Sequence, residues 1–455
     1  MHYSLYAILY TLYTENIWYP KFFSVSAYSQ PSLHSALFAV LIFSGKLPIG
    51  DKKNVPQGEV ILWGTLPESD MNGIIQQFNP QAKTFRVTYK EVREDMFSQK
   101  LLEALANGNA PDLIIAPYQI ILSQTSRLYP FPIASYGEKQ YKDTYIDGAG
   151  IFFTPYGALA LPVSVEPMVL FYNRTLLSKH GVVNPPSYWN EVSEMTPRLT
   201  VQNNKGQFVE SAIALGAPNT PYAKDILMAL VGQLGQVPVL TQYSPTGVQY
   251  MSVIADNPIE VGGQVSPLSE SLRYFTLFAD PTQKTYTWNQ FMGNADDAFV
   301  SEKLAMYIGY SGELADLRAR NPRAAIEMTG LPQTKGYNTF STGMRMYGIA
   351  TLKSTKNANT ALTVQSSFAS GGIAPAIAGI VGGVPPFRSY TSSQGLSSVI
   401  ASSMLVAHGW QDSFYVKSSE YTYTMISDVL NNRQGITDAV NAFVSRMQDL
   451  YTPLK

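Results

Sequence analysis

The sequence predicts an α/β protein of two lobes, in which helices cover mainly parallel sheets. A chain of 455 residues is too long for one ordinary hydrophobic core, so we expect more than one lobe. Between residues 58 and 117 a strand–helix–strand–helix–strand pattern is typical of a parallel sheet covered by helices. Two apolar runs in the middle of the chain, at residues 158–161 and 168–172, predict further buried strands.

The first pattern consists of short apolar strands alternating with amphipathic segments. Strands are predicted from apolar or alternating side chains at residues 58–63, 85–92 and 113–117. Residues 71–78 form a helix in this interpretation, because Ile74, Ile75 and Phe78 share one side. A second helix is predicted over residues 94–107 and ends at Gly108.

The two central apolar runs are separated by proline and polar residues. Pro162 closes the first run, and Ser164 and Glu166 form a short polar break before the second. Dense Val, Leu, Phe and Tyr residues favour strands, so we expect two consecutive buried strands here.

The rest of the chain follows the same local patterns. A short helix is expected to end at Gly181, and another to begin near Tyr188 or Trp189. Further strands are predicted at residues 211–216, 304–310 and 345–352, and further helices at residues 223–233, 268–281, 421–430 and 436–447. The charge-free stretch 371–387 is dense in Gly, Ala and Pro, and we expect it to be a crossing between lobes and a loop.

The composition excludes several functional classes. Charged residues make up only 14% of the chain and the net charge is −1, so no nucleic-acid partner is expected. The absence of Cys excludes disulfides, thiol catalysis and thiolate-bound metals or clusters. The four His residues lack a metal-binding spacing, and neither a phosphate-binding loop nor a dinucleotide fingerprint is present. We therefore expect no metal site and no cofactor.

Residues 1–57 form an N-terminal hydrophobic region followed by a linker at residues 45–57. The charge-free segment Phe22–Ser44 is long enough to cross a bilayer, which takes about 20 residues. No small-residue cleavage pattern follows it, which favours an uncleaved signal anchor over a cleaved signal peptide. The flanking lysines do not satisfy the positive-inside rule, and an ordinary buried helix is the alternative.

One series of motifs occurs in an order that is specific to a known family. The motifs are Leu161-Pro162, Glu166, Phe171-Tyr172-Asn173, Gly181, Pro185-Pro186 and Trp189. The chain resembles the extracellular solute-binding proteins of ABC importers, in the class that includes maltose-binding protein. Further likenesses, at residues 104–115, 299–306 and 385–390, extend the resemblance over Gly58 to Lys455. Glu302 departs from the family, which commonly has Gly there, so that turn is expected to differ.

The resemblance implies a two-lobe, periplasmic-binding-protein-like fold of type II, with crossing strands between the lobes. The first lobe would comprise residues 58–163 plus about 326–375, and the second residues 164–325 plus about 376–455. The family implies hinge closure on a small solute, no catalysis, and the permease subunits of an ABC transporter as partners. It also implies an extracytoplasmic position, with the N-terminal segment as the contact to the membrane.

Candidate binding residues follow from the resemblance and from the rule that ligands lie at the carboxyl ends of parallel strands. Glu166 is the foremost candidate, because relatives place a carboxylate after the first crossing, where it can accept two hydroxyl donors. Its alternative role is that of an acid supporting the hinge. The other expected ligand-binding residues are Glu68, Thr65, Tyr118, Tyr310, Ser311, Arg345 and Tyr347, and the expected hinge residues are Ser164 and Val165.

Two other functional classes remain open from the sequence. A membrane-anchored sensor or adhesin would use the same fold without transport. A hydrolase would use paired carboxylates such as Glu68 and Glu166. A carbohydrate is the expected solute, whereas peptides, polyols and phosphate esters remain alternatives. The scarcity of basic residues in the expected cleft argues against a multiply charged anion.

Overall fold

The structure is a computed structural model that describes residues 55–132, 137–236, 239–244, 247–252, 259–260 and 264–451. All of them belong to one compact unit within Pro48–Lys455. The predicted anchor segment, residues 22–44, lies outside the described residues. Within the described ranges no helix is both long and apolar enough to cross a membrane.

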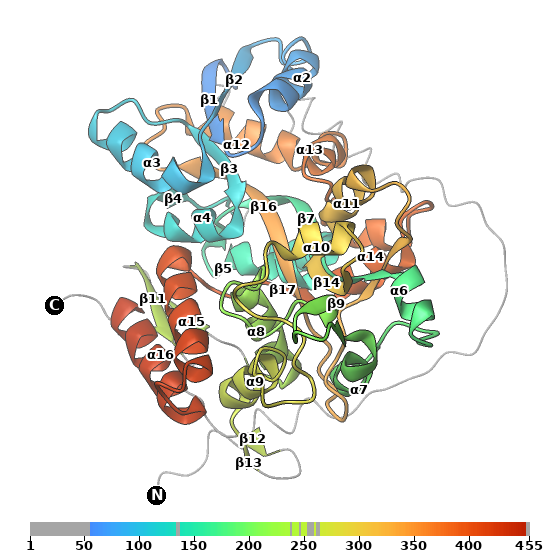
Figure 1. The fold of residues 1–455 in the computed structure, drawn as a ribbon. Helices are drawn as coiled ribbons and strands as arrows, with labels where there is room; N and C mark the ends of the chain where they lie inside the picture. Colours follow the sequence, from blue (N-terminus) through green and yellow to red (C-terminus); the bar gives the residue numbers. More distant parts are fainter. Residues whose placement is uncertain are drawn as a thin grey trace, which may run out of the picture. The chain divides into compact units, whose positions relative to one another are not determined.

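The N-terminal half of the main sheet has the predicted alternating pattern. Strand β1 (Gly58–Gly64) lies between β2 (Phe85–Glu91) and β3 (Leu113–Pro117), and both pairings are parallel. Helices α2 (Glu68–Phe78) and α3 (Phe97–Ala106) connect these strands. Figure 1 shows this group in blue, with α12 (Ala358–Phe368) and α13 (Ala374–Ile380) from much later in the chain beside it.

Two long strands run through the centre of the sheet, whose order is β2-β1-β3-β16-β7-β14-β9-β8. They are β7 (Leu161–Asn173) and β16 (Thr342–Leu352), which pair antiparallel. The prediction of two separate strands in this region is wrong, because β7 continues through both prolines. Pro162 lies opposite Gly348, where the register shifts by a bulge, and Pro167 lies opposite Met344. An irregular register is where a strand accommodates a proline, which lacks the N–H donor.

The second half of β7 pairs with strands from the C-terminal half of the chain. Strand β14 (Leu304–Tyr310) runs antiparallel to β7 and parallel to β9 (Phe208–Ile213). Strand β15 (Ile326–Gly330) pairs antiparallel with the same stretch of β7, and β8 (Val201–Gln202) closes the sheet order beside β9. The predicted fold class, an α/β protein with two lobes and crossing strands, is confirmed; antiparallel pairs surround the two long strands.

The remaining elements are helices and short strands, and some of these strands form separate two-stranded sheets. The longer helices are α7 (Trp189–Leu199), α8 (Ala223–Gln233), α9 (Pro267–Thr276), α14 (Ser398–Leu405), α15 (Tyr415–Leu430) and α16 (Ile436–Tyr451). The shorter ones are α4 (Tyr118–Ser123), α5 (Glu138–Thr144), α6 (Arg174–Lys179), α10 (Ala295–Val300) and α11 (Leu314–Arg320). Short 3-10 helices are η1 (Glu94–Met96), η2 (Thr125–Arg127), η3 (Asp147–Phe152), η4 (Ser311–Glu313) and η5 (Arg388–Ser392). Short strands are β4 (Leu128–Tyr129), β5 (Phe153–Thr154), β6 (Gly157–Ala158), β10 (Val239–Ser244), β11 (Gly247–Ser252), β12 (Ile259–Glu260), β13 (Gln264–Val265) and β17 (Ala407–His408).

The hydrophobic core changes along β7, which explains why this strand joins the lobes. Val163 and Val165 pack in the cluster around β1–β3, whereas Met168 and Leu170 pack in a second cluster with α8 and α9. Beyond Glu166 the strand is therefore buried among different partners. Residues close to the C-terminus also belong to the first cluster, because Ile377, Phe387 and Met404 pack in it. The division of the chain into lobes at the stated boundaries stays a prediction.

Two local features differ from a plain loop or turn. The stretch 371–387, expected to be a crossing and a loop, contains α13, with Pro375 in its first turn, where its missing N–H costs no hydrogen bond. Its end still meets the central strand, because Val165 and Val384 exchange two backbone hydrogen bonds. Glu302, which replaces the family's Gly, has a φ of +59°, and its carboxylate accepts a hydrogen bond from Asn173 Nδ2.

Candidate functional site

The central feature of the candidate site is an ion pair between the two long strands. Glu166 of β7 faces Arg345 of β16 in the sheet register. Arg345 Nε donates to Oε1 at 2.9 Å and Nη2 donates to Oε2 at 2.6 Å, a bidentate pair. Glu166 is fully buried, whereas the Arg345 side chain is 32% exposed. The exposed surface of this pair therefore belongs to the arginine side chain and not to the carboxylate.

Glycines leave room for the Glu166 carboxylate. A Cβ on Gly312 would lie 2.3 Å from Glu166 Oε2, and a Cβ on Gly383 would lie 2.3 Å from Ser164 Oγ. Both distances are far below van der Waals contact, so no larger residue fits without displacement. The ion pair is enclosed by backbone from segments far apart in the sequence.

The guanidinium of Arg345 lies over the aromatic ring of the last residue of β14. Its Cζ is 4.9 Å from the ring centroid of Tyr310, a cation–π distance. Tyr310 Oη donates to Asp225 Oδ2 at 2.9 Å, which ties the end of β14 to the first turn of α8. These contacts bring a charged, an aromatic and an acidic side chain together at one place.

Glu313 holds the tyrosines around this point. It accepts hydrogen bonds from Tyr307 Oη at 2.9 Å and from the backbone N–H of Tyr310 at 2.7 Å. The ring of Tyr222 meets that of Tyr310 edge to face, with centroids 4.8 Å apart. Tyr222 has a φ of +56°, a left-handed conformation that a tyrosine rarely adopts, so the surrounding contacts hold it there. We call Tyr222, Asp225, Tyr310, Glu313 and Arg345 the junction cluster.

Burial dominates the electrostatics of the junction cluster. It raises the pKa of the Asp225 and Glu313 carboxyls, although nearby Arg345 and their hydrogen bonds act in the opposite direction. Burial also raises the pKa of the Tyr310 hydroxyl well above its ordinary value, and the charge of Asp225 adds to this. Burial opposes the charge on Arg345, but hydrogen bonds to Glu166 raise its pKa, so it stays a cation.

Three further side chains, those of Tyr347, Glu94 and Tyr118, lie near the junction cluster. Tyr347 of β16 is nearly buried, which raises its pKa, and the charge of Glu94 adds to the effect. Glu94 is an exposed residue, but partial loss of water around its carboxyl raises its pKa, and the charge of Arg345 lowers it. Tyr118, at the start of α4, is 1% exposed; burial and the charge of Asp225 raise its pKa. The hydroxyl of Tyr118 therefore senses the charge of Asp225 on α8.

A second buried ion pair, next to the junction cluster, joins α8 to the segment that precedes α15. Lys224 Nζ donates to Asp412 Oδ2 at 2.9 Å and to Ser418 Oγ at 3.2 Å. The ammonium also lies 5.3 Å from the ring centroid of Trp410. Trp410 is only 5% exposed, and its indole Nε1 has no hydrogen-bond partner among the described residues.

The predicted site residues thus occupy different positions. Arg345 contacts Glu166 and Tyr310, with Ser311 directly after Tyr310 in the chain and buried. Tyr347 and Tyr118 lie on the first-lobe side, and Thr65 follows β1 half-buried. Glu68 is exposed at the start of α2, where its backbone N–H donates to the Glu91 carboxylate at 2.8 Å. Their roles in binding stay predictions.

Several residues in or beside the junction cluster were not predicted from the sequence. They are Tyr222, Asp225, Glu313, Glu94 and Trp410. Glu313 offered a signal, because it stands three residues after Tyr310, the spacing at which a carboxylate accepts from the N–H of the residue before a helical turn, as it does at the start of η4. For Tyr222 and Asp225 the sequence shows only a helix start, and nothing local indicates that it faces β14.

The predicted hinge residues lie where β7 is irregular. Tyr347 pairs with Ser164 and Gly348 with Pro162, so Val163 is an extra residue opposite the shift. Such bulges bend a strand and increase its twist. Ser164 Oγ is buried without a hydrogen-bond partner in the described part of the chain. A bend at this position is compatible with the predicted hinge.

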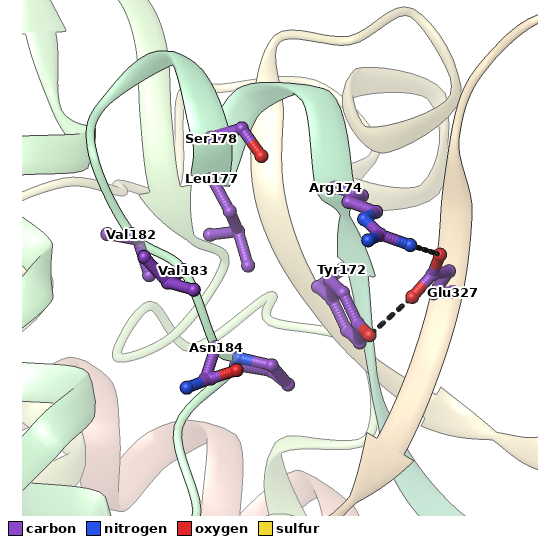
Figure 2. Close-up of a pocket in the computed structure, with 9 residues that line it drawn as sticks. Tyr172, Arg174, Leu177, Ser178, Val182, Val183, Asn184 and Glu327 are labelled. Atoms are coloured by element: carbon purple, nitrogen blue, oxygen red, sulfur yellow. Dashed lines mark hydrogen bonds and ion pairs between the residues drawn. The ribbon is translucent and has the colours of Figure 1, made fainter.

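A separate small pocket lies on the second lobe, away from the residues above. Its volume is about 160 Å³, and it is lined by Tyr172, Arg174, Leu177, Ser178, Val182, Val183, Asn184, Pro185 and Glu327. Figure 2 shows that Tyr172 and Arg174 point toward Glu327 on one side, opposite the Val182–Asn184 loop. Tyr172 Oη donates to Glu327 at 2.6 Å and Arg174 at 3.0 Å, so the polar groups already have partners.

Comparison with known proteins identifies a family and a fold. A family model described as bacterial extracellular solute-binding protein matches residues 73–393. Three curated relatives, candidate binding proteins of Brucella abortus and Brucella suis, are 25% identical over 122 residues. That alignment covers 25% of this chain and 28% of each relative, so the chain spans less than a third of their length.

Solved structures match over most of the chain. An ABC transporter solute-binding protein of Thermotoga lettingae, bound with α-D-tagatose, is 17% identical, covers 87% of this chain and 100% of its own, and has a TM-score of 0.63. The sugar-binding protein MalE of Xanthomonas citri is 15% identical, with 86% and 97% covered and a TM-score of 0.69. A cyclo/maltodextrin-binding protein complexed with maltotetraose is 14% identical, with 89% and 100% covered and a TM-score of 0.69. These neighbours and the matched family are binding proteins rather than enzymes.

Proposed function

Because the chain belongs to the family of bacterial extracellular solute-binding proteins, we propose that it captures a small polar solute and delivers it to the permease of an ABC transporter. The solute would bind between the two lobes, at the junction cluster. Closure of the lobes by hinge motion would then enclose it. Binding and release, and not a chemical reaction, are the proposed activity.

The proposed solute is a carbohydrate. The observation that carries this proposal is the arrangement of Tyr310, Arg345 and Asp225, which places an aromatic ring beside charged hydrogen-bonding groups. Saccharides present C–H surfaces that pack on aromatic rings, together with hydroxyls that need hydrogen-bond partners when buried. Tagatose and maltotetraose bound to two structural neighbours support the same class.

Each predicted residue has a proposed part in binding. Arg345 would contact the solute directly, and Glu166 would act through it by fixing the guanidinium plane. Tyr310, Ser311, Tyr347, Tyr118, Thr65 and Glu68 would line the rest of the site. Ser164 and Val165 would form the hinge, beside the bulge of β7.

The proposed setting is the extracytoplasmic face of the cell membrane. The family description supports a location outside the cytoplasm. Anchoring through the N-terminal hydrophobic segment is a prediction from the sequence alone, because that segment lies outside the described residues. The proposed lobes are residues 58–163 with about 326–375, and residues 164–325 with about 376–455.

A thermal-shift screen of the full chain tests this proposal. The panel contains mono- and oligosaccharides, amino acids and peptides, and hits are measured by isothermal titration calorimetry. A solute at 100 times its dissociation constant adds about 2.7 kcal/mol of stability to a protein that binds it only when folded. We expect saccharides to give the shifts.

Two variants locate the site. Arg345→Lys keeps the charge but loses the bidentate geometry, and we expect affinity for the identified solute to fall at least roughly tenfold. Arg174→Lys, at an exposed pair with Glu327, is the matched control and leaves affinity unchanged. A panel without any shift, or a solute consumed during titration, would overturn the binding function, and equal affinities of the two variants would overturn the location.

A further inference from the structure

We propose that the solute is a cationic saccharide, that is, a polyhydroxylated ring compound that carries a protonated amine. This inference rests on the proposed function and specifies its ligand. It follows from the balance of charge at the junction, from the aromatic rings there, and from a buried donor that has no partner.

The ionisable groups at the junction are mostly acidic. Two cations, Arg345 and Lys224, face five carboxylates, those of Glu94, Glu166, Asp225, Glu313 and Asp412. Each cation is already bonded to one carboxylate: Arg345 to Glu166 and Lys224 to Asp412. Three carboxylates therefore have no ion-pair partner of their own at this place.

Of these remaining carboxylates, Asp225 and Glu313 accept hydrogen bonds from hydroxyl and amide donors, whereas Glu94 is exposed. Asp225 accepts from the Tyr310 hydroxyl, and Glu313 accepts from the Tyr307 hydroxyl and the Tyr310 amide. A buried carboxylate is destabilised by the loss of water, and a nearby positive charge compensates for this loss. A ligand amine would supply that charge, whereas a ligand carboxylate or phosphate would add to the repulsion.

The aromatic groups at the junction favour the same ligand. The rings of Tyr222 and Tyr310 meet edge to face, and a guanidinium already lies over Tyr310. The electron-rich faces of such rings attract ammonium groups as well as guanidinium groups. Tyr310 is only 3% exposed, so the half-buried ring of Tyr222 is the one that would pack against the C–H face of a sugar ring.

A buried hydrogen-bond donor indicates that the ligand carries acceptors too. Trp410 is 5% exposed and its Nε1–H has no partner among the described residues. The Lys224 ammonium lies over the Trp410 ring. Burial and the charges of Asp225 and Asp412 all raise the pKa of the nearby Tyr118 hydroxyl. Buried donors are rarely left unpaired, so a hydroxyl oxygen of the ligand is the expected acceptor. The same ligand would thus combine hydroxyls with an amine.

Calorimetric titration of the full chain with matched saccharides tests the inference. The probes are glucosamine, glucose and glucuronate, with the β-1,4-linked disaccharide of each, at pH 6.5 and low salt. We expect the glucosamine probes to bind at least roughly tenfold more tightly than the glucose probes, and the glucuronate probes to bind most weakly. The preference should diminish as salt is added, because screening weakens interactions between charges.

Variants assign the preference to the junction carboxylates. Asp225→Asn keeps the side-chain shape and removes the charge, so the ratio of affinities for the amine and the neutral probe should shrink to about twofold. Glu94→Gln removes another of these negative charges at an exposed position, where no buried packing changes. Glu59→Gln, at an exposed position of β1, is the control.

The outcomes separate this inference from the function on which it rests. Neutral probes that bind as tightly as cationic ones, or a preference unchanged in both Asp225→Asn and Glu94→Gln, would overturn the cationic ligand and leave carbohydrate binding intact. If no probe bound and the wider saccharide panel also failed, both the inference and the carbohydrate function would be wrong.

Discussion

Arg345 and Glu166 are 179 positions apart in the chain, and they form a bidentate ion pair between β16 and β7. The carboxylate is fully buried and the guanidinium is partly exposed. Removing one member of a buried pair is costly, because the other remains in a medium of low dielectric constant without compensation. The pair therefore links the stability of the lobe junction to the geometry of the candidate site.

Arg345→Ala should strongly destabilise the protein. It leaves the Glu166 carboxylate buried without its partner, and we expect a loss of ~3–5 kcal/mol in the free energy of unfolding. Urea denaturation followed by circular dichroism measures it. Arg174→Ala removes an exposed pair with Glu327, for which we expect less than ~1 kcal/mol. Similar losses in the two variants would contradict the role assigned to the junction pair.

Gly312→Ala should disturb the same pair through packing. The added methyl group would lie 2.3 Å from Glu166 Oε2 and 2.6 Å from the carbonyl oxygen of Val381. Overpacking of this kind typically costs about 1–3 kcal/mol. At Gly293 the corresponding methyl group meets nothing within 4 Å, so Gly293→Ala is the matched control. A Gly312→Ala protein as stable as this control would show that the backbone moves aside freely.

Asp225 should make stability depend on pH in an unusual direction. Burial raises its pKa in the folded state, although Lys224 lowers it and Asp412 raises it. Between the ordinary carboxyl pKa of about 4 and the raised value, the folded state binds the proton more tightly, so the free energy of unfolding falls as pH rises. The comparison is wild type against Asp225→Asn by urea denaturation across this range.

The opposite slope is expected for Glu327, which serves as the control. Hydrogen bonds from Tyr172 and Arg174 lower its pKa, so its contribution to stability is present at neutral pH and is lost as pH falls through the lowered value. Relative to Glu327→Gln, wild-type stability should therefore rise with pH. Equal slopes for the Asp225 and Glu327 pairs would refute the assignment of burial as the cause at Asp225.

Gln233 should be essential for the packing around α8. It is fully buried; its Oε1 accepts from Trp189 Nε1 at 2.8 Å, and its Nε2 donates to the carbonyls of Pro332 and Ser341. Gln233→Leu leaves these groups buried without partners, and we expect a loss of about 2–4 kcal/mol. Gln77→Leu, at an exposed position of α2, should change stability by less than ~0.5 kcal/mol. Thermal unfolding of both variants checks the difference.

The local elements were largely predictable from the sequence, because they depend on neighbours. Alternating apolar side chains predicted a strand at residues 85–92, which is β2 (Phe85–Glu91). A one-sided apolar pattern predicted a helix at residues 71–78, which lies within the longer α2 (Glu68–Phe78). Hydrophobic periodicity does not predict a helix or strand where the composition of the segment carries little pattern. Helix α13 lies in a stretch rich in Gly, Ala and Pro, which carries a weak pattern, and the prolines of β7 suggested a break that a bulge avoids.

The sequence by itself determined the α/β class, the order of the elements and the types of residue from which the candidate site is drawn. Only the tertiary structure decided which of them meet: that Glu166 bonds to Arg345, and that Asp225 and Glu313 surround Tyr310. The physical reason is the range of the interactions. Helix and strand patterns arise from residues a few positions apart, whereas these contacts depend on the register between strands and on the packing of α8 against the sheet.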